Sequence, residues 1–332
     1  MAQFLRVNAA LARAPHKPGR AVMMEAELQK QIKRLSAGDQ VSASLELRDS
    51  LALWGIDVDV QGDTLRLASP LQLLDKRAIL KGLDAPVAEA LTGIEAHWSI
   101  DSTNTYLLEQ AATPMFHGAV CLAERQGAGK GRRGKSWVSP FGKNIYMSIG
   151  WQFAMSASSL GGLSLVAGMA VVKSLRILGV TNIGLKWPND VLSGVGKMAG
   201  ILVEVVPVKG EMHVVLGIGI NLSLSEAEAQ GIDQSWSTVP AALGLSRNQV
   251  CAALLNHLIP DLVRFGEVGF EPFAAEWPRV NCFAGQELMV SLGDQTITGV
   301  DRGIDAQGQL ILETPAGLRH FNAGEVSLRR AR

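Results

Sequence analysis

The sequence has little that would support a disulfide framework, a structural zinc site or a strong electrostatic partner. Its three cysteines, Cys121, Cys251 and Cys282, lie far apart and form no CxxC pair, so neither cross-links nor a zinc site is indicated. This cysteine usage fits a reducing compartment, and we predict a cytoplasmic protein. Basic and acidic residues both number 31, so no global attraction to nucleic acid or a membrane surface follows. No apolar run reaches the length of a membrane span, and we expect no membrane partner.

Arrangements for nucleophilic catalysis are also missing. The six histidines are scattered, and no convincing Ser-His-Asp or Cys-His constellation accompanies them, so a covalent enzyme intermediate is not indicated. A hydrophobic content of 47% over 332 residues is typical of a globular protein with a sizeable core and two or three domains.

What the chain does have is a basic, glycine-rich stretch, Gly127 to Ser136, which reads G-A-G-K-G-R-R-G-K-S. Glycine lets a backbone approach a ligand closely, and Lys and Arg neutralise phosphate charge. We interpret this stretch, hereafter the basic loop, as a binding loop for a phosphorylated or adenylated ligand. The alternative is a solvated basic turn.

The basic loop also matches two nucleotide-binding patterns. Gly129 to Ser136 satisfies G-x-x-x-x-G-K-[ST], and Gly129 to Gly134 satisfies G-x-G-x-x-G. Both patterns need a helix after the loop, because the helix N-terminus supplies part of the anion site. Pro140 and Gly142 follow so soon that a long helix is disfavoured. We therefore predict another binding geometry and keep a P-loop NTPase as the alternative.

The first 24 residues carry four Lys or Arg and no acid, and they lack the continuous apolar core of a secretory signal. We predict a disordered extension over residues 1–24, with a true start at Met23 or Met24 as an alternative.

Residues 25–70 are predicted to form a winged-helix-like domain. Glu25 to Leu35 and Ser42 to Trp54 have helical periodicity, and Ile56 to Val60 and Thr64 to Leu67 alternate like the strands of a hairpin. Winged helices commonly bind DNA, but residues 41–67 hold five acids and two basic residues, whereas a DNA-reading surface is normally basic. DNA binding and a role in packing or protein contact are therefore both open.

The middle of the chain alternates buried strands and helices. We predict strands at Ala119 to Ala123, Asn144 to Trp151, Gly200 to Val206 and Val214 to Leu222, and a core helix from Gly162 to Leu178. The last of these strands carries alternating glycines, which bare one face for close approach of a ligand or backbone. A capping box at Ser246 opens another helix to about Phe265, with a kink expected at Pro260.

Two polar clusters interrupt this pattern. Asp101 to Asn104 can cap a helix or bind a small polar ligand, and spacing alone favours the cap. Lys186 to Asp190, K-W-P-N-D, gathers a lysine, an amide and a carboxylate around a proline-fixed turn. After Asn281, short strands with turns at Gly293-Asp294, Gly303, Gly308 and Pro315 to Gly317 predict a small closed barrel.

These stretches together resemble the biotin protein ligases of the bacterial class that doubles as biotin operon repressor. The matching segments occur in the family's order and spacing, and the resemblance runs from about Leu71 to the C-terminus. They are Asp101 to Asn104, Glu124 to Trp137, Lys186 to Asp190, Lys197 to Glu204 and Gly217 to Asn221.

The resemblance implies an α+β fold with three parts. A ligase domain with a mixed sheet, similar to class II synthetase domains, would occupy residues 71–280. An SH3-like barrel would follow over 281–332, and a winged helix would precede over 25–70.

The implied reaction joins biotin to ATP as biotinyl-5′-AMP and then transfers biotin to a lysine of a biotin carboxyl carrier protein, a subunit of acetyl-CoA carboxylase. ATP, biotin and Mg²⁺ are the implied cofactors, with Mg²⁺ screening the triphosphate. No protein metal ligands are expected. Operator DNA and a homodimer are the further partners that the resemblance implies. A repressor without ligase activity is the remaining alternative.

The resemblance also assigns site residues. Lys197 and Arg132 correspond to the catalytic cations. The biotin-binding positions would be Ser102, Thr103, Asn104, Gln126, Lys130, Gly131, Arg132 and Lys197. The ATP-binding positions would be Arg132, Lys135, Trp137, Lys186, Asn189, Asp190 and Asn221. Lys130 and Lys135 stand where the family usually has arginine, which keeps the charge but loses the bidentate fork.

Overall fold

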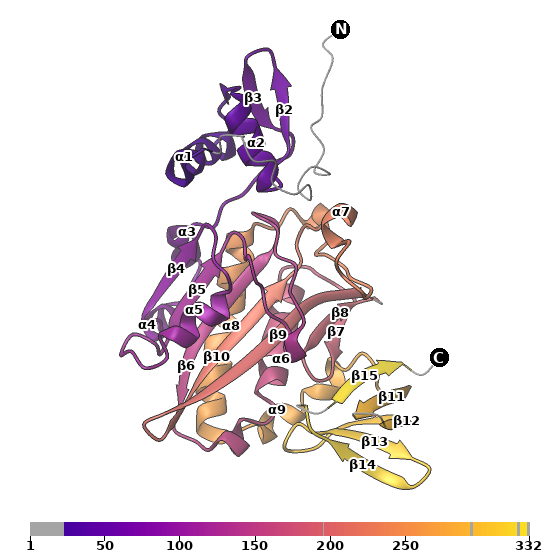
Figure 1. Ribbon diagram of the computed structural model, residues 1–332. Coiled ribbons are helices and arrows are strands. Elements are labelled where there is room, and N and C mark those ends of the chain that lie inside the picture. Colours follow the sequence, from indigo (N-terminus) through magenta and orange to yellow (C-terminus); the bar gives the residue numbers. More distant parts are fainter. Residues whose placement is uncertain (1–22, 195, 293–294, 324–325, 331–332) are drawn as a thin grey trace.

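The computed structural model describes residues 23–194, 196–292, 295–323 and 326–330. Residues 1–22 of the predicted extension and the predicted turn at Gly293-Asp294 lie outside the described residues. Three parts follow one another in Figure 1: an N-terminal unit, a large central sheet with its helices, and a small C-terminal sheet.

The N-terminal unit confirms the predicted helices and hairpin. It consists of α1 (Glu25–Ser36), β1 (Val41–Ser42), α2 (Leu45–Leu53), β2 (Val58–Gln61) and β3 (Thr64–Leu67). The strands form one antiparallel sheet in the order β1-β3-β2. The second helix begins later than its periodicity predicts, because Ser44 caps it by accepting from the Leu47 amide at 3.1 Å and Val41–Ser42 pair with β3.

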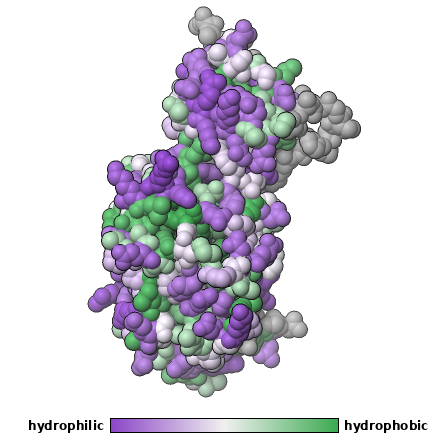
Figure 2. All heavy atoms as spheres, turned by 90° about the vertical axis from the view of Figure 1, so that its left-hand side faces the viewer, coloured by the Kyte–Doolittle hydropathy of each residue, from purple (hydrophilic) through white to green (hydrophobic). Residues whose placement is uncertain are grey.

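The core of this unit is completed by residues from the central domain. Phe141 is buried among its apolar side chains, with its ring centroid 4.9 Å from Trp54 and 5.6 Å from Trp98. Lys33 of α1 lies over the Trp98 ring at 5.6 Å. Figure 2, a side view, shows apolar atoms gathered below this unit. The N-terminal unit is therefore packed on the segment that directly follows the basic loop.

The central domain is built on a seven-stranded mixed sheet of order β4-β5-β6-β10-β9-β8-β7. Only β4 and β5 run parallel; the other neighbours are antiparallel. The predicted strands are confirmed, and several run longer than their sequence patterns indicated. The bounds are β4 (Gly93–His97), β5 (Ala119–Ala123), β6 (Ile145–Phe153), β7 (Ile183–Lys186), β8 (Asp190–Ser193), β9 (Gly196–Val208) and β10 (Glu211–Ile220).

Helices cover the two faces of this sheet unequally. The long helices α6 (Leu163–Ile177) and α8 (Arg247–Val268) pack on one face, and the short α5 (Thr103–Glu109) packs on the other (Figure 1). The other helices are α3 (Lys76–Lys81), α4 (Ala85–Ala90), α7 (Glu226–Ala229) and α9 (Glu271–Ala274), with single 3-10 turns at Arg132–Gly134, Ala157–Leu160, Ala241–Leu243 and Trp277–Arg279.

Among the described residues, the stretch Ala157–Ile177 is long and apolar enough to cross a membrane, yet 61% of its most apolar part is buried within the protein. It contains α6, the core helix predicted from the sequence. The capping box of α8 is also confirmed at Ser246 and Gln249. That helix continues through Pro260 to Val268, past its predicted end.

The C-terminal part contains the five strands expected from the turn spacing. They are β11 (Glu287–Leu292), β12 (Gln295–Ile304), β13 (Leu310–Thr314), β14 (Gly317–Phe321) and β15 (Val326–Arg330), in the antiparallel order β14-β13-β12-β11-β15. Within the described residues, β14 and β15 are the sheet's edges. Gly303 was predicted as a turn; it lies instead inside β12, at a register shift between Asp301 and Ile304.

Candidate functional site

A cavity lies on the face of the central sheet that α5 covers, where glycines leave the strands bare. Gly217 and Gly219 of β10 pair with Leu202 and Gly200 of β9. A Cβ at 217 would be 2.1 Å from Asn104 Oδ1, and a Cβ at 219 would be 2.4 Å from the Trp137 ring. The predicted close approach to this face is therefore made by two side chains from other segments, where a ligand or another backbone was expected.

The basic loop folds as a tight turn over this cavity. Gly131 N–H donates to the Lys135 carbonyl at 2.7 Å and Trp137 N–H to the Gly129 carbonyl at 2.8 Å. Arg133 at the tip has a left-handed φ of 56°. Residues 135–144 contain no helix. The loop thus lacks the helix N-terminus that both regular nucleotide-binding patterns require.

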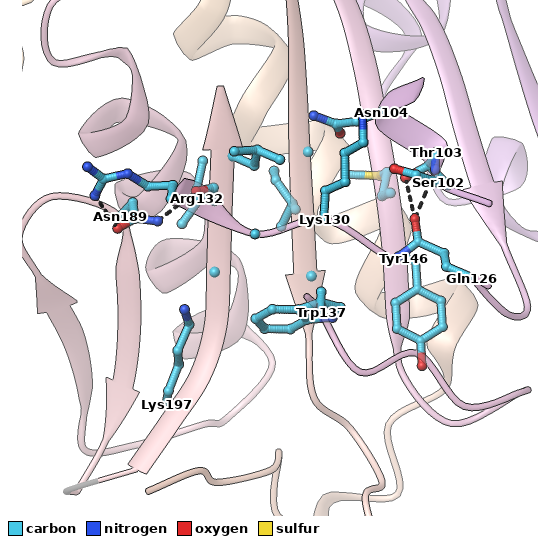
Figure 3. Close-up of a pocket in the computed structure, with 18 residues that line it drawn as sticks. Ser102, Thr103, Asn104, Gln126, Lys130, Arg132, Trp137, Tyr146, Asn189 and Lys197 are labelled. Atoms are coloured by element: carbon cyan, nitrogen blue, oxygen red, sulfur yellow. Dashed lines mark hydrogen bonds between the residues drawn. The ribbon is translucent and has the colours of Figure 1, made fainter. Parts of the chain in front are cut away.

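The polar floor of the cavity comes from the start of α5 and from the segment that joins β5 to the basic loop. Ser102 caps α5, and Ser102, Thr103 and Asn104 are all buried. The Thr103 amide donates to Gln126 Oε1 at 2.9 Å, and Gln126 Nε2 donates to Ser139 Oγ at 3.0 Å. Ser102 to Asn104 therefore both begin a helix and line a pocket, as Figure 3 shows, whereas Asp101 does not line it.

Cations lie on the opposite side of the cavity. Lys197 Nζ is 2.6 Å from Asp190 Oδ1 and 5.3 Å from the centroid of the Trp137 ring. Lys186 Nζ is 3.9 Å from Asp190 Oδ2. Burial lowers the pKa of Lys186, while the Asp190 carboxylate acts to raise it. Asp190 at the end of the K-W-P-N-D turn thus forms ion pairs with both Lys186 and Lys197.

Arg132 ties the basic loop to two other parts of the chain. Its Nη1 donates to Asn189 Oδ1 at 2.9 Å, and its Nη2 donates to the Ala323 carbonyl of the C-terminal part. Burial lowers the pKa of this guanidinium. The involvement of Ala323 has no signal in the sequence, because the contact joins segments 191 positions apart.

A second, larger cavity of about 370 Å³ adjoins the first, which is about 50 Å³. Trp137 and Lys197 line both, and Asn221 and Lys135 line the larger. Lys135 Nζ is 3.8 Å from Asp233 Oδ2 at the rim. Trp236 also lines this cavity. Sequence reasoning missed Trp236, since it lies in an irregular segment without a recognisable motif.

The structure brings the sequence-predicted residues together. All eight positions assigned to biotin line the smaller cavity, as do Trp137 and Asn189. Asp190 and Lys186 line neither cavity. Asp190 is ion-paired with Lys197, which lines both cavities, and Lys186 is ion-paired with Asp190. Figure 3 shows Lys130 lying across the cavity toward Asn104. The smaller cavity has a glycine-bearing floor and cations that can hold an anion, and the larger cavity beside it has room for a nucleotide. Together they suit a ligand in which a small molecule is joined to a nucleotide.

Comparison with known proteins agrees with this geometry. Residues 97–221 match the biotin/lipoate A/B protein ligase family, and residues 284–329 match the biotin protein ligase C-terminal domain. The class of protein is therefore that of the biotin and lipoate protein ligases.

Individual relatives show which family within this class the chain belongs to. The bifunctional ligase/repressor BirA of Escherichia coli is 38% identical over 84% of this chain and 85% of its own. The biotin–[acetyl-CoA-carboxylase] ligase of Mycobacterium tuberculosis is 35% identical over 68% of this chain and 85% of its own. The Aquifex aeolicus biotin protein ligase, solved with biotin and ATP, superposes with a TM-score of 0.61 at 28% identity over 72% of this chain and 99% of that one. The chain belongs to the biotin protein ligase family.

Proposed function

We propose that this protein activates biotin with ATP and transfers it to a lysine of the biotin carboxyl carrier protein of acetyl-CoA carboxylase. The observation that carries the proposal is the convergence of the polar floor, the basic loop and Lys197 on one cavity beside a larger one. Residues 71–280 would form the catalytic domain, with 25–70 and 281–332 as flanking domains. The three cysteines form no disulfide, which fits a cytoplasmic location.

In the first step, an oxygen of the biotin carboxylate attacks the α-phosphorus of ATP, and pyrophosphate leaves. Two anions must meet, so cations at the reacting atoms lower the barrier. Lys197 is suited to this role because it lies where the two cavities join. In the free protein its ammonium is held by Asp190, and the bound carboxylate and phosphate would compete for it.

The floor would hold the ureido head of biotin. The Ser102 hydroxyl accepts from the Thr105 amide at 3.5 Å, which leaves its own proton to donate to a ligand oxygen. Thr103, Asn104 and Gln126 would complete the polar contacts. Lys130, Gly131 and Arg132 would close over the carboxyl end. A cavity of about 50 Å³ is too small for biotin, so we expect the basic loop to open for entry.

The larger cavity would take the nucleotide. Trp137 and Trp236 provide aromatic surfaces for adenine, and Lys135, Asn189, Asp190, Lys186 and Asn221 would supply polar contacts. Among the described residues, no group of three metal-ligating side chains could hold a metal ion. Mg²⁺ would therefore enter with the triphosphate, which supplies oxygen ligands when it is bound.

In the second step, the ε-amine of the carrier lysine attacks the acyl carbon of biotinyl-5′-AMP, and AMP leaves. One assay tests both steps: incubation with ATP, Mg²⁺, labelled biotin and a carrier domain should label a single lysine. Labelled adenylate without labelled carrier would support the first step alone. Phosphate release from ATP without biotin would instead support an NTPase.

A second candidate function is repression of transcription in response to biotin. It is favoured by the winged-helix-like N-terminal unit and by relatives named as ligase/repressors over 84% of this chain. The partners would be operator DNA and a second copy of the chain. Biotin and ATP should then produce a salt-dependent shift of a promoter fragment. No shift at low salt would remove this function.

A further inference from the structure

A chain of hydrogen bonds runs beneath the smaller cavity and begins at a residue that does not line it. Glu204 of β9 accepts from Asn104 Nδ2 at 2.8 Å. Ser148 Oγ of β6 lies 2.5 Å from Asn104 Oδ1 and 2.7 Å from Thr103 Oγ1. Thr103 Oγ1 lies 3.2 Å from Gln126 Oε1. The carboxylate of Glu204 is therefore linked to most of the pocket floor.

The groups at the two ends of this series of hydrogen bonds fix the direction in which each bond is donated. An ionised carboxylate can only accept, so Asn104 must turn its NH₂ toward Glu204 and its oxygen toward Ser148. At the other end, the Thr103 backbone N–H can only donate, so Gln126 must turn its oxygen toward Thr103. Both amide orientations follow from chemistry.

Counting protons shows what this direction does to the floor. Ser148 and Thr103 have one hydroxyl proton each, but their oxygens make three close contacts with each other and with the two amide oxygens. Ser148 donates its proton to Asn104 Oδ1. Thr103 can donate its proton either to Ser148 Oγ or to Gln126 Oε1, but not to both. One contact is left without a proton, so the floor has a surplus of acceptors.

The reverse direction would have no such surplus. If Asn104 turned over, its NH₂ could donate to Ser148, Ser148 to Thr103, and Thr103 to Gln126, so that all three contacts would be satisfied. Among the contacts described, the Glu204 carboxylate is what opposes this arrangement. Glu204 lies on the face of β9 shared with Gly200 and Leu202, which line the cavity, and its side chain acts through Asn104.

We propose that Glu204 is a positioning residue that sets the hydrogen-bond polarity of the pocket so that it selects a ligand with N–H donors. This inference rests on the proposed function, because the cyclic urea of biotin offers two such donors. Asn104 Oδ1, which lies directly over Gly217 of the pocket floor, is the acceptor that Glu204 keeps in place. An amide oxygen has two lone pairs, so Asn104 Oδ1 can accept from Ser148 and from a ligand N–H together. A variant in which Asn104 no longer presents this oxygen binds the ligand less tightly.

Biotin-dependent ATP–pyrophosphate exchange tests the proposal with three substitutions. Glu204→Met removes the acceptor, Glu204→Lys offers only donors, and Glu204→Gln keeps an oxygen that Asn104 can donate to. The KM for biotin should rise about 10- to 100-fold in the Met and Lys variants, as loss of a buried hydrogen-bond partner implies. The KM for ATP should stay within about twofold, and the Gln variant should behave like the wild type.

Glu211→Met is the matched control, since Glu211 is an acid on the neighbouring β10 whose side chain is 53% exposed. It should leave both KM values unchanged. An unchanged KM for biotin in Glu204→Met would overturn the proposal. So would a Gln variant as impaired as the Met variant, or a rise in both KM values together with a lower Tm. Absence of biotin-dependent exchange in the wild type would refute the proposed function instead.

Discussion

The indole ring of Trp137 lies on the bare Cα of Gly219, where a Cβ would be 2.4 Å from the ring. Gly219→Ala would therefore push the indole off the sheet and disturb both cavities that it lines. We expect adenylate formation at limiting biotin to fall by about tenfold or more, since a misplacement of an ångström can cost up to about 100-fold. The measurement is biotin-dependent pyrophosphate exchange.

Gly93→Ala is the control for this substitution. Gly93 is a glycine of the same sheet, in β4, and no atom lies within 4 Å of the position of an added Cβ. We expect full activity and a change in the free energy of unfolding within about 0.5 kcal/mol. If both alanine variants lost activity equally, the contact between Trp137 and Gly219 would not be the cause.

The glycine pattern of β10 shows how far sequence reasoning reached. Alternation of Gly217 and Gly219 predicted that something approaches the strand closely, because glycine inside a strand has few other uses. It indicated a ligand or another backbone, and it did not identify the two side chains that lie there. Asn104 and Trp137 occupy these positions, and both come from segments whose placement depends on the sheet order. Local patterns predict an element, whereas a contact between distant segments needs the tertiary fold.

The same limit explains which site residues were found. Motifs with unusual composition, such as the basic loop and Lys186 to Asp190, were visible because their residues are grouped in the sequence. Glu204 ends one of the matching segments, but the sequence indicates no role for it, since its partner Asn104 lies 100 positions away. Trp236 and Ala323 lie in stretches without a pattern. The closed barrel was predicted from turn spacing, which indicates strand number but not whether the edge strands pair.

Lys197→Ala should abolish most adenylate formation, because Lys197 is the cation placed where the two cavities join. Loss of one preorganised charge at a reacting centre typically costs about 100- to 1,000-fold in rate. Pyrophosphate exchange at saturating biotin and ATP measures this directly. Lys81→Ala, at an exposed lysine of α3, should be fully active. Exchange at the wild-type rate in Lys197→Ala would remove the proposed role of Lys197.

The buried ion pair of Glu124 and Arg247 should matter for stability more than any surface pair. Both side chains are only 5% exposed. Arg247 also donates to the carbonyls of Asn144 and Gln72, each at 3.0 Å, and Glu124 accepts from the Leu74 amide at 2.6 Å. Arg247→Met would leave a buried carboxylate without its cation, so urea unfolding should show a loss of about 3–5 kcal/mol.

Two further variants distinguish the cost of leaving Glu124 unpaired from a general loss of stability. The double substitution Glu124→Met with Arg247→Met removes both charges and should recover part of the loss, because no unpaired charge remains buried. Arg264→Met breaks an exposed pair, in which Arg264 and Glu276 are 3.9 Å apart and 48% exposed, and should cost less than about 1 kcal/mol. A double variant less stable than Arg247→Met alone would contradict this account.

Asp261 of α8 should make stability depend on pH. Partial burial raises the pKa of its carboxyl from the usual 3.8 to about 6, although Lys173 and Arg264 act to lower it. Between these two values the folded state holds a proton that the unfolded state has released. The free energy of unfolding therefore falls as the pH rises through that window, and the full penalty is present above pH 6.

Asp261→Asn removes this penalty. The variant should be more stable than the wild type at pH 7.5 by about 1 kcal/mol, because solvent screens much of the roughly 3 kcal/mol that the shift implies. That gain corresponds to a Tm higher by roughly 2–4 °C, and it should vanish near pH 4, where the wild-type carboxyl is protonated. Thermal unfolding from pH 4 to 7.5 measures both. Glu267→Gln, an equal charge change at an exposed site on the same helix, should give a Tm difference without this pH dependence; the same profile in both variants would assign the effect to net charge.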